Sequence, residues 1–482
     1  MTALRLRGSI GHALLIAAVA SLPGRVARAA DNNVPHLQKQ GTATQLIVDG
    51  KPFLILGAAA ADPAKPEAWT RLKALNANTA ITPVTWSAIE PKEGQFDFRS
   101  IDALLKDAQT NKLHVIIQWS GATTGTPVWF KSDPKSLGDD VAAADAKAFA
   151  ALLKHIAGTD AAHTVIAAQV EGKLTGPSDA AKAAAGKPEV GFAGDESARA
   201  AFAGKVAAAG KAAFALPLYL VCETDKPEDA AAFLAAVRSV CPAIDFIAPA
   251  IHSGNFAPLA AKFTSETNPL FIAEANGGAT GAANLLYAFG KYNAIGAALP
   301  DVPNAAPDAA TPAFFATVAG MAPALLDNQG KDTLHAFMFG PGSPDEAAQQ
   351  EVAMMGPFAL TVRASAPAGG NPGGRGGGSG RGGGGGGAGA AIGTSTTLSG
   401  IVIAIKPYEY LALHSGLNIA VAPTDRSLGA FALGFQETGN FIEGKWVRYA
   451  RTNGDENDHD RRADGALNGR WTNLHVAFYQ RP

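Results

Sequence analysis

Residues 149–170, FAALLKHIAGTDAAHTVIAAQV, join a helix pattern directly to the pattern of a buried strand. In the first half, apolar residues recur at the spacing i, i+3, i+4 and i+7, which places them on one face of a helix. These residues are Phe149, Leu152, Leu153 and Ile156. Gly158 can end the helix. The run 164–170 is almost continuously apolar, as expected for a strand of a parallel sheet that is covered on both faces.

The same alternation repeats along the chain from Gln45 onward. Short apolar runs are separated by longer, alanine-rich amphipathic stretches, which predicts strands alternating with helices around a parallel sheet. The predicted strands are residues 52–57, 79–84, 114–119, 164–170, 215–221, 245–250, 269–273 and 294–298. Since eight such units can close on themselves, we expect an α/β fold, a (β/α)8 TIM barrel, over residues 35–366.

The composition excludes several classes of protein. The chain has 482 residues, 47% of them hydrophobic, and 40 basic side chains against 42 acidic ones. A formal net charge of -2 gives no basic surface for tracking phosphates, so we expect no nucleic-acid partner. The two cysteines lack the C-x-x-C spacing of a metal or redox motif. The acidic stretch 455–460 lacks the distal glutamate of a calcium loop, so we expect neither a metal nor a cofactor.

The first 29 residues have the three parts of a secretory signal peptide. Arg5 and Arg7 precede an apolar run at 13–22, and Ala27-Arg28-Ala29 forms a small-x-small cleavage site. The apolar run is too short to span a bilayer. We therefore expect a periplasmic or secreted protein that keeps no stable membrane anchor after cleavage.

The chain changes character near its C-terminus. Residues 369–389 contain 15 glycines in 21 positions, so we expect a disordered linker over 367–397. After Leu398, short β-rich runs are separated by turns such as Asn453-Gly454. This pattern predicts a small antiparallel, sandwich-like β-domain over residues 398–482.

Polar residues at the ends of the predicted barrel strands are the candidates for chemistry, because the carboxyl ends of all barrel strands meet at one face. Glu274 stands directly after the apolar run 270–273, where an unpaired charge would be costly. Either this glutamate is functional, or it is a structural acid paired with a nearby base.

Four motifs, in this order along the chain, resemble those of β-galactosidase-like glycoside hydrolases of clan A. They are NANT at 76–79, WSAIEPKEGQFDF at 86–98, HTVIAAQVE at 163–171 and NPLFIAE at 268–274. The combination is similar to a bacterial subgroup with a C-terminal β-domain of unassigned function. The resemblance implies a TIM barrel and a retaining mechanism with two carboxylates, one a nucleophile and the other an acid/base.

The resemblance assigns the nucleophile to Glu274 and changes the acid/base position. In the family strand four ends Val-Glu-Asn-Glu, whereas here Lys173 stands in place of the second glutamate. A lysine of ordinary pKa near 10.4 is a poor proton donor at neutral pH. Glu171 lies two residues earlier, on the same side of an ideal strand, and either has a structural role or replaces the acid. We predict that Lys173 and Glu274 form an ion pair across the site.

Sugar contacts are expected from residues around the same end of the barrel. Trp86, Trp119 and Trp129 either stack on sugar faces or pack in the core. His252 and Asn276 follow strands six and seven and are further candidates for binding the substrate.

The sequence leaves two hypotheses for function. One is an exported β-galactosidase-like exo-glycosidase, weakened because Lys173 replaces the acid. The other is a carbohydrate-binding or structural barrel that no longer turns over. Both expect a carbohydrate partner, such as a β-galactoside or a related oligosaccharide.

Overall fold

The computed structural model describes residues 34–122, 124–175, 196–224, 227–252, 254–300, 309–364, 396–424, 431–442, 445–453 and 471–480. The predicted signal peptide, the acidic stretch 455–460 and all but the last two residues of the predicted linker lie outside these ranges.

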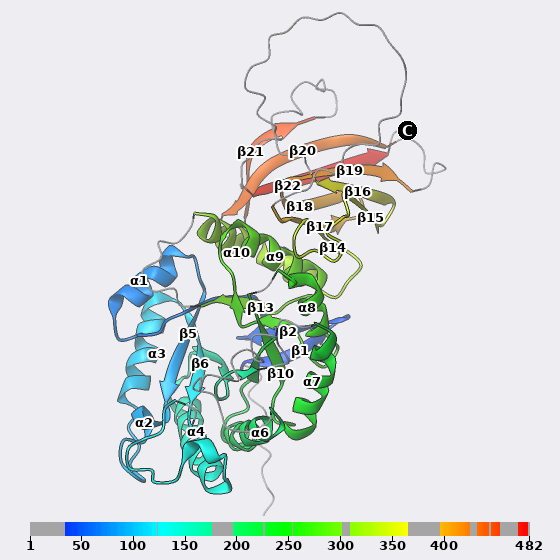
Figure 1. The fold of residues 1–482 in the computed structure, drawn as a ribbon. Helices are drawn as coiled ribbons and strands as arrows, with labels where there is room; N and C mark the ends of the chain where they lie inside the picture. The colour runs from blue at the N-terminus through cyan, green and yellow to red at the C-terminus, as the bar shows by residue number, and fades with distance from the viewer. Residues whose placement is uncertain are drawn as a thin grey trace, which may run out of the picture. The chain divides into compact units, whose positions relative to one another are not determined.

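A parallel barrel forms the first part of the described chain (Figure 1). Its strands follow one another around the ring in chain order, and the predicted (β/α)8 fold is confirmed. They are β4 (Ile55–Ala59), β5 (Thr79–Thr85), β6 (His114–Ser120), β7 (Val165–Gln169), β9 (Leu218–Glu223), β10 (Phe246–Ile251), β11 (Phe271–Ile272) with β12 (Glu274–Ala275), and β13 (Gly296–Leu299). A short strand, β8 (Leu174–Thr175), adds to β9.

The seventh strand of the ring is divided at Ala273. Its first half, β11, pairs with β13, whereas its second half, β12, pairs with β10. The chain is continuous between the halves, and the Ala273 N–H donates to the Pro249 carbonyl at 2.9 Å. Because β13 also pairs with β4, the pairing runs around the whole ring.

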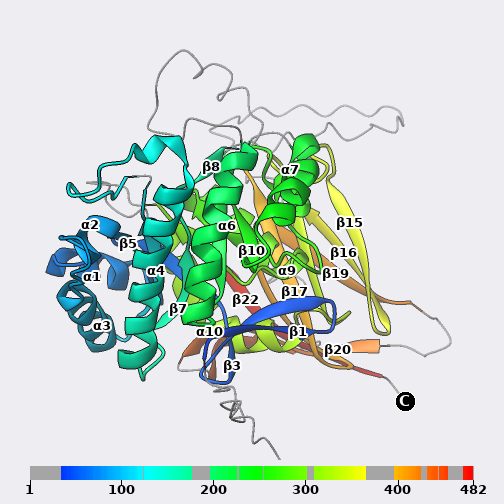
Figure 2. The same ribbon diagram turned by 90° about the horizontal axis from the view of Figure 1, so that it is seen from below.

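Helices cover the outside of the barrel (Figure 2). They are α1 (Pro66–Ala74), α2 (Trp86–Ile89), α3 (Arg99–Asn111), α4 (Asp139–Thr159), α6 (Glu196–Ala213), α7 (Pro227–Val240), α8 (Phe256–Lys262), α9 (Gly278–Lys291) and α10 (Ala310–Asn328), with a 3-10 turn at Pro134–Ser136. The four apolar residues that predicted α4 are fully buried. By length and composition α10 alone among the described helices could cross a membrane, but eight of its side chains are buried in the protein, as in a core helix.

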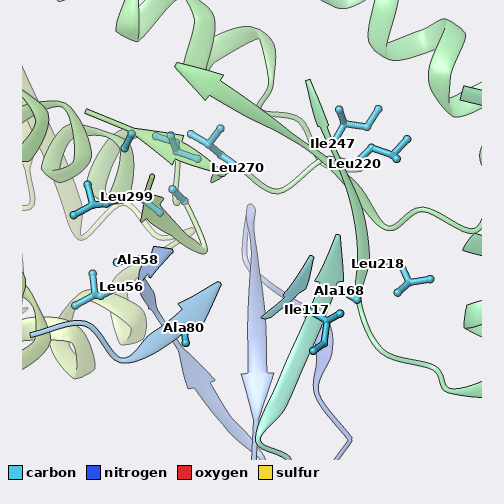
Figure 3. Packing of buried hydrophobic residues seen from close by; sticks show 14 of the residues in the cluster. Leu56, Ala58, Ala80, Ile117, Ala168, Leu218, Leu220, Ile247, Leu270 and Leu299 are labelled. Atoms are coloured by element: carbon cyan, nitrogen blue, oxygen red, sulfur yellow. The ribbon is translucent and has the colours of Figure 1, made fainter. Parts of the chain in front are cut away.

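Two apolar clusters fill the barrel region. The larger cluster lies between strands and helices, and Figure 3 labels members of it from several strands, such as Leu56, Ile117 and Leu220. The smaller cluster fills the barrel interior and includes Tyr219, Phe246 and Phe271. It also takes in residues of an N-terminal antiparallel sheet made of β1 (His36–Gln40), β2 (Ala43–Val48) and β3 (Lys51–Phe53). This small sheet therefore packs against the interior core.

The C-terminal strands form two antiparallel sheets. The six-stranded sheet has the order β14 (Leu334–Phe339), β17 (Leu398–Lys406), β18 (Glu409–Ser415), β22 (Thr472–Gln480), β20 (Phe431–Ile442) and β21 (Lys445–Thr452). The three-stranded sheet has the order β15 (Gln350–Met355), β16 (Phe358–Ala364) and β19 (Leu417–Pro423). The predicted antiparallel β-domain is confirmed, but its expected start at residue 398 is wrong. Strands β14 to β16 precede residue 366 and pair with β17 and β19, because backbone hydrogen bonding joins them to strands that come later in the chain.

Candidate active site

Glu274 begins β12 at the carboxyl end of the seventh barrel strand, where its side chain is 21% exposed. Lys173 Nζ donates to Glu274 Oε2 at 2.6 Å. His252 Nε2 lies 3.1 Å from the same oxygen. The predicted ion pair between Lys173 and Glu274 is therefore present, and the histidine adds a second partner to the carboxylate.

Lys173 reaches Glu274 because the fourth strand is interrupted. Pairing with β9 stops at Gln169 and resumes at Leu174, so the four residues 170–173 lie opposite only two residues of β9, 220–221. Leu174 and its partner Cys222 both belong to the core outside the barrel. Since side chains alternate along a strand, Lys173 points toward the barrel interior, where Glu274 lies.

Glu223, which ends β9, is the site residue that the sequence analysis missed. Its Oε2 lies 3.9 Å from Lys173 Nζ, and its side chain is 52% exposed. Ala250 on β10 pairs with Glu223 on one side and with Glu274 on the other, so the two glutamates stand at one level of the barrel. The signal was available, because Glu223 follows the apolar run Leu218–Cys222 as Glu274 follows its own run.

Aromatic side chains lie beneath these charged groups in the barrel interior. The Tyr219 and Phe246 rings are stacked with centroids 5.1 Å apart, and Phe271 packs edge-on to Tyr219 at 5.4 Å. Burial, together with the nearby charge of Glu274, raises the pKa of Tyr219 far above its ordinary value. The phenol of Tyr219 is therefore neutral, lies beneath the charged groups, and does not serve as a catalytic acid.

The remaining polar candidates lie next to Glu274. Asn276 Nδ2 donates to the His252 carbonyl at 3.3 Å, which connects the loop after β12 to the end of β10. Both side chains are exposed, so they can meet a ligand from solvent. The structure thus brings Lys173, His252, Glu274 and Asn276 together.

Glu171 faces away from this group, contrary to its expected position on the same side as Lys173. Its backbone has a φ of 59°, in the left-handed region, which breaks the alternation of the strand. The side chain is 2% exposed and hydrogen-bonds with the carboxyl of Asp145 on α4. Glu171 therefore joins the barrel wall to a helix and does not face Glu274.

Asp145 is the centre of this buried contact. Trp119 Nε1 donates to Asp145 Oδ1 at 2.8 Å, and the Ala122 N–H donates to Oδ2 at 2.6 Å. Burial raises the pKa of Asp145, while the hydrogen bonds from Glu171, Trp119 and Ala122 act in the opposite direction. Two carboxyl groups in such contact bind a proton between them rather than carry two charges.

The three tryptophans lie in or against the core. Trp86 and Trp119 are fully buried, and the Trp86 Nε1–H donates to Glu90 at 2.9 Å. Trp129 is partly buried, packs edge-on to Trp86, and donates to the Glu90 carbonyl at 2.8 Å. In this structure neither buried ring presents a face to solvent, so the core alternative describes Trp86 and Trp119.

The arrangement supplies a partly exposed carboxyl group, Glu274, with a second one, Glu223, nearby. A carboxylate at this position can attack an electrophilic carbon, and a neighbouring carboxyl group can transfer a proton. The ammonium of Lys173 lies near both carboxylates, those of Glu274 and Glu223.

Two family models match the chain. Residues 66–145 match the model described as Beta-galactosidase, which covers α1 to the start of α4. Residues 313–464 match a domain of unknown function, DUF5597. Part of the barrel is thus similar to β-galactosidases, and the C-terminal part is similar to a domain whose role is unassigned.

A curated relative and several solved structures are similar to the chain. A β-galactosidase from Xanthomonas manihotis is 32% identical over 185 residues, which is 33% of this chain and 29% of that protein. The chain therefore spans less than a third of the curated relative's length. A β-mannanase from the mussel Mytilus edulis superposes with a TM-score of 0.42 at 11% identity, over 56% of this chain and 93% of that one. An intracellular xylanase from Thermoanaerobacterium saccharolyticum gives 0.38 at 15% identity, over 52% and 85%.

Proposed function

We propose that this β-galactosidase-like glycoside hydrolase chain acts as a retaining exo-glycosidase on a β-galactoside or a related oligosaccharide, with Glu274 as the nucleophile. The observation that carries the proposal is the carboxylate of Glu274, held at the carboxyl end of the seventh strand by Lys173 and His252. The family match over residues 66–145 supports the substrate class. His252, Asn276 and the partly buried Trp129 are the proposed sugar contacts.

Lys173 accounts for a weakened reaction in this proposal. The ammonium paired with Glu274 is a poor proton donor to a departing alkoxide. Its positive charge also opposes the charge that develops on an oxocarbenium-like sugar. We expect slow cleavage of ordinary glycosides and faster cleavage where the leaving group needs no proton.

A second candidate is carbohydrate binding without turnover. It is favoured by the short Lys173 to Glu274 contact, because a nucleophile bonded to an ammonium must give up that partner to attack. Under either candidate the apolar N-terminal segment supports export to the periplasm or the medium.

Hydrolysis of an aryl β-galactoside with an acidic phenol, measured beside lactose, tests the proposal in the wild-type protein and in Glu274→Ala. Activated phenolates depart without a proton donor, so this substrate reports the nucleophile. We expect turnover of the aryl galactoside that is lost in Glu274→Ala. Binding of galactosides without turnover of either substrate would favour the second candidate.

A further inference from the structure

We propose that Glu223 is the proton-transferring partner of Glu274, and that the Lys173 ammonium between the two carboxylates keeps this partner from donating. The inference rests on the proposed function and names a second reacting group at the same site. It places this group at the end of the fifth strand, where the residues Leu218–Glu223 deliver it.

The two carboxylates lie close enough together to permit a retaining reaction. Lys173 Nζ lies 2.6 Å from Glu274 Oε2 and 3.9 Å from Glu223 Oε2, so these oxygens are at most about 6.5 Å apart. Retaining glycosidases place their carboxyl groups about 5 to 5.5 Å apart, whereas inverting ones need about 6.5 to 9.5 Å to admit a water. The upper bound of about 6.5 Å therefore allows the retaining distance and reaches only the shortest distance of the inverting range.

The backbone fixes both groups on rigid elements. Glu223 and Glu274 share Ala250 as their register partner, which aligns them across β9, β10 and β12. Tyr219 and Val221, four and two residues before Glu223, belong to the interior cluster. Since alternate residues share a face, Glu223 also points into the mouth of the barrel.

The reaction balances with one water. Glu274 Oε attacks the anomeric carbon as the bond to the leaving oxygen breaks, and that oxygen takes the proton of the Glu223 carboxyl. A water then attacks the anomeric carbon, gives its proton to the Glu223 carboxylate, and releases Glu274 as a carboxylate. Sugar hemiacetal and alcohol leave, and both glutamates return to their starting states.

Lys173 affects the two steps differently. Its ammonium lies within 3.9 Å of both carboxylates, in the space that the leaving oxygen must enter to take a proton from Glu223 in the first step. The second step needs only a water beside Glu223, whose side chain is 52% exposed. Removing the ammonium should therefore speed the first step more than the second.

Trapping at Glu274 separates the two steps. The probe is 2,4-dinitrophenyl 2-deoxy-2-fluoro-β-galactoside, whose leaving group needs no acid, followed by mass spectrometry of the labelled peptide. We expect wild type and Glu223→Gln to label Glu274 at similar rates. Breakdown of the labelled enzyme should be about 10²-fold or more slower in Glu223→Gln. Added azide should restore breakdown and yield β-galactosyl azide. Glu266→Gln, an exposed glutamate in the loop before β11, is the matched control.

Removing the ammonium tests the second half of the proposal. Lys173→Met should raise lactose turnover at least about tenfold, and the double variant Lys173→Met, Glu223→Gln should lose that gain. Circular dichroism of each variant checks that the fold is kept.

The outcomes separate the two proposals. Wild-type breakdown rates in Glu223→Gln, or a Lys173→Met gain that survives in the double variant, overturn the role of Glu223. If Lys173→Met shows no gain in lactose turnover, Lys173 does not keep Glu223 from donating its proton, and this half of the proposal is overturned. No labelling of Glu274 in the wild-type protein overturns the proposed function itself, and the role of Glu223 with it.

Discussion

Two carboxyl groups at the mouth of the barrel contrast with two that are buried in its wall. Glu274 and Glu223 lie beside solvent and share the Lys173 ammonium. Asp145 and Glu171 are shielded from solvent and share a hydrogen bond. Glu171 and Lys173 are only two residues apart, yet they belong to different groups, because the left-handed backbone at Glu171 turns its side chain toward α4.

The contrast teaches which carboxylate can react. A buried pair that receives N–H bonds from Trp119 and Ala122 is fully used in holding strand, loop and helix together. The pair at the mouth is held by a cation and is open to a ligand. Chemistry is therefore expected where the carboxylates are partly exposed and held by a lysine, and stability where they are buried and hydrogen-bonded to several elements.

The largest expected effect comes from Glu274→Gln. Turnover of an aryl β-galactoside should fall at least about 10³-fold, because an amide cannot form the glycosyl-enzyme. The melting temperature should stay close to that of wild type, because the residue is partly exposed and lies outside the buried wall. Kinetics and calorimetry on the same preparation check both statements. A variant that keeps its activity would remove Glu274 from the reaction.

Asp145→Ala should give the opposite result, a loss of stability. The indole N–H of Trp119 and the backbone N–H of Ala122 would lose their acceptor, at a cost of about 3 kcal/mol in the free energy of unfolding. Chemical denaturation measures this value. Asp139→Ala on the same helix is the control, since its pair with Lys205 lies on the surface and contributes little. Equal losses in both variants would contradict a special role for the buried pair.

A third buried group should make stability depend on pH. Burial lowers the pKa of His414 on β18 to about 4 from an ordinary value near 6.5. The unfolded chain therefore takes up this proton first as the pH falls. The stabilisation is present above pH 6.5 and is lost as the pH falls toward 4, an effect of about 3 kcal/mol. His414→Gln should make the denaturation midpoint depend less on pH between pH 6.5 and pH 4. An unchanged slope would mean that His414 is protonated in the folded protein.

The smallest effect is expected from Glu223→Gln on stability. Its side chain is 52% exposed and its oxygen lies 3.9 Å from the lysine, so the pair contributes about 0.5 kcal/mol or less. Denaturation at low and moderate salt measures this. A loss above about 2 kcal/mol would place Glu223 with the structural carboxylates and not with the reacting ones.

Much of the fold followed from local pattern. The eight predicted runs overlap the eight strand positions of the barrel, since buried parallel strands are apolar throughout and their helices carry one apolar face. The first run, 52–57, begins in β3, and the short strands β8 and β12 were not predicted. The pairing of Lys173 with Glu274 was also predictable, because both residues end barrel strands and carry opposite charge.

The misplaced features depend on backbone geometry or distant pairing. Glu171 left the expected face through one residue with positive φ. For Trp86 and Trp119 the sequence left stacking and core packing open, and hydrogen bonds to the buried carboxylates of Glu90 and Asp145 decided for the core. Strands β14 to β16 joined sheets whose other members follow the glycine-rich segment. Apart from the pair Trp86 and Glu90, which has helical i,i+4 spacing, these features have no periodic pattern in the sequence.

The sequence by itself determined the barrel, the C-terminal β-sheets and the identity of Glu274 and Lys173, because hydrophobic period and strand ends are local properties of the chain. Only the tertiary structure decided which carboxylates meet. The register of β9, β10 and β12 brings Glu223 level with Glu274, while an interrupted fourth strand sends Glu171 to the wall and Lys173 to the mouth. These placements depend on hydrogen bonding between strands, which no single segment of the chain encodes.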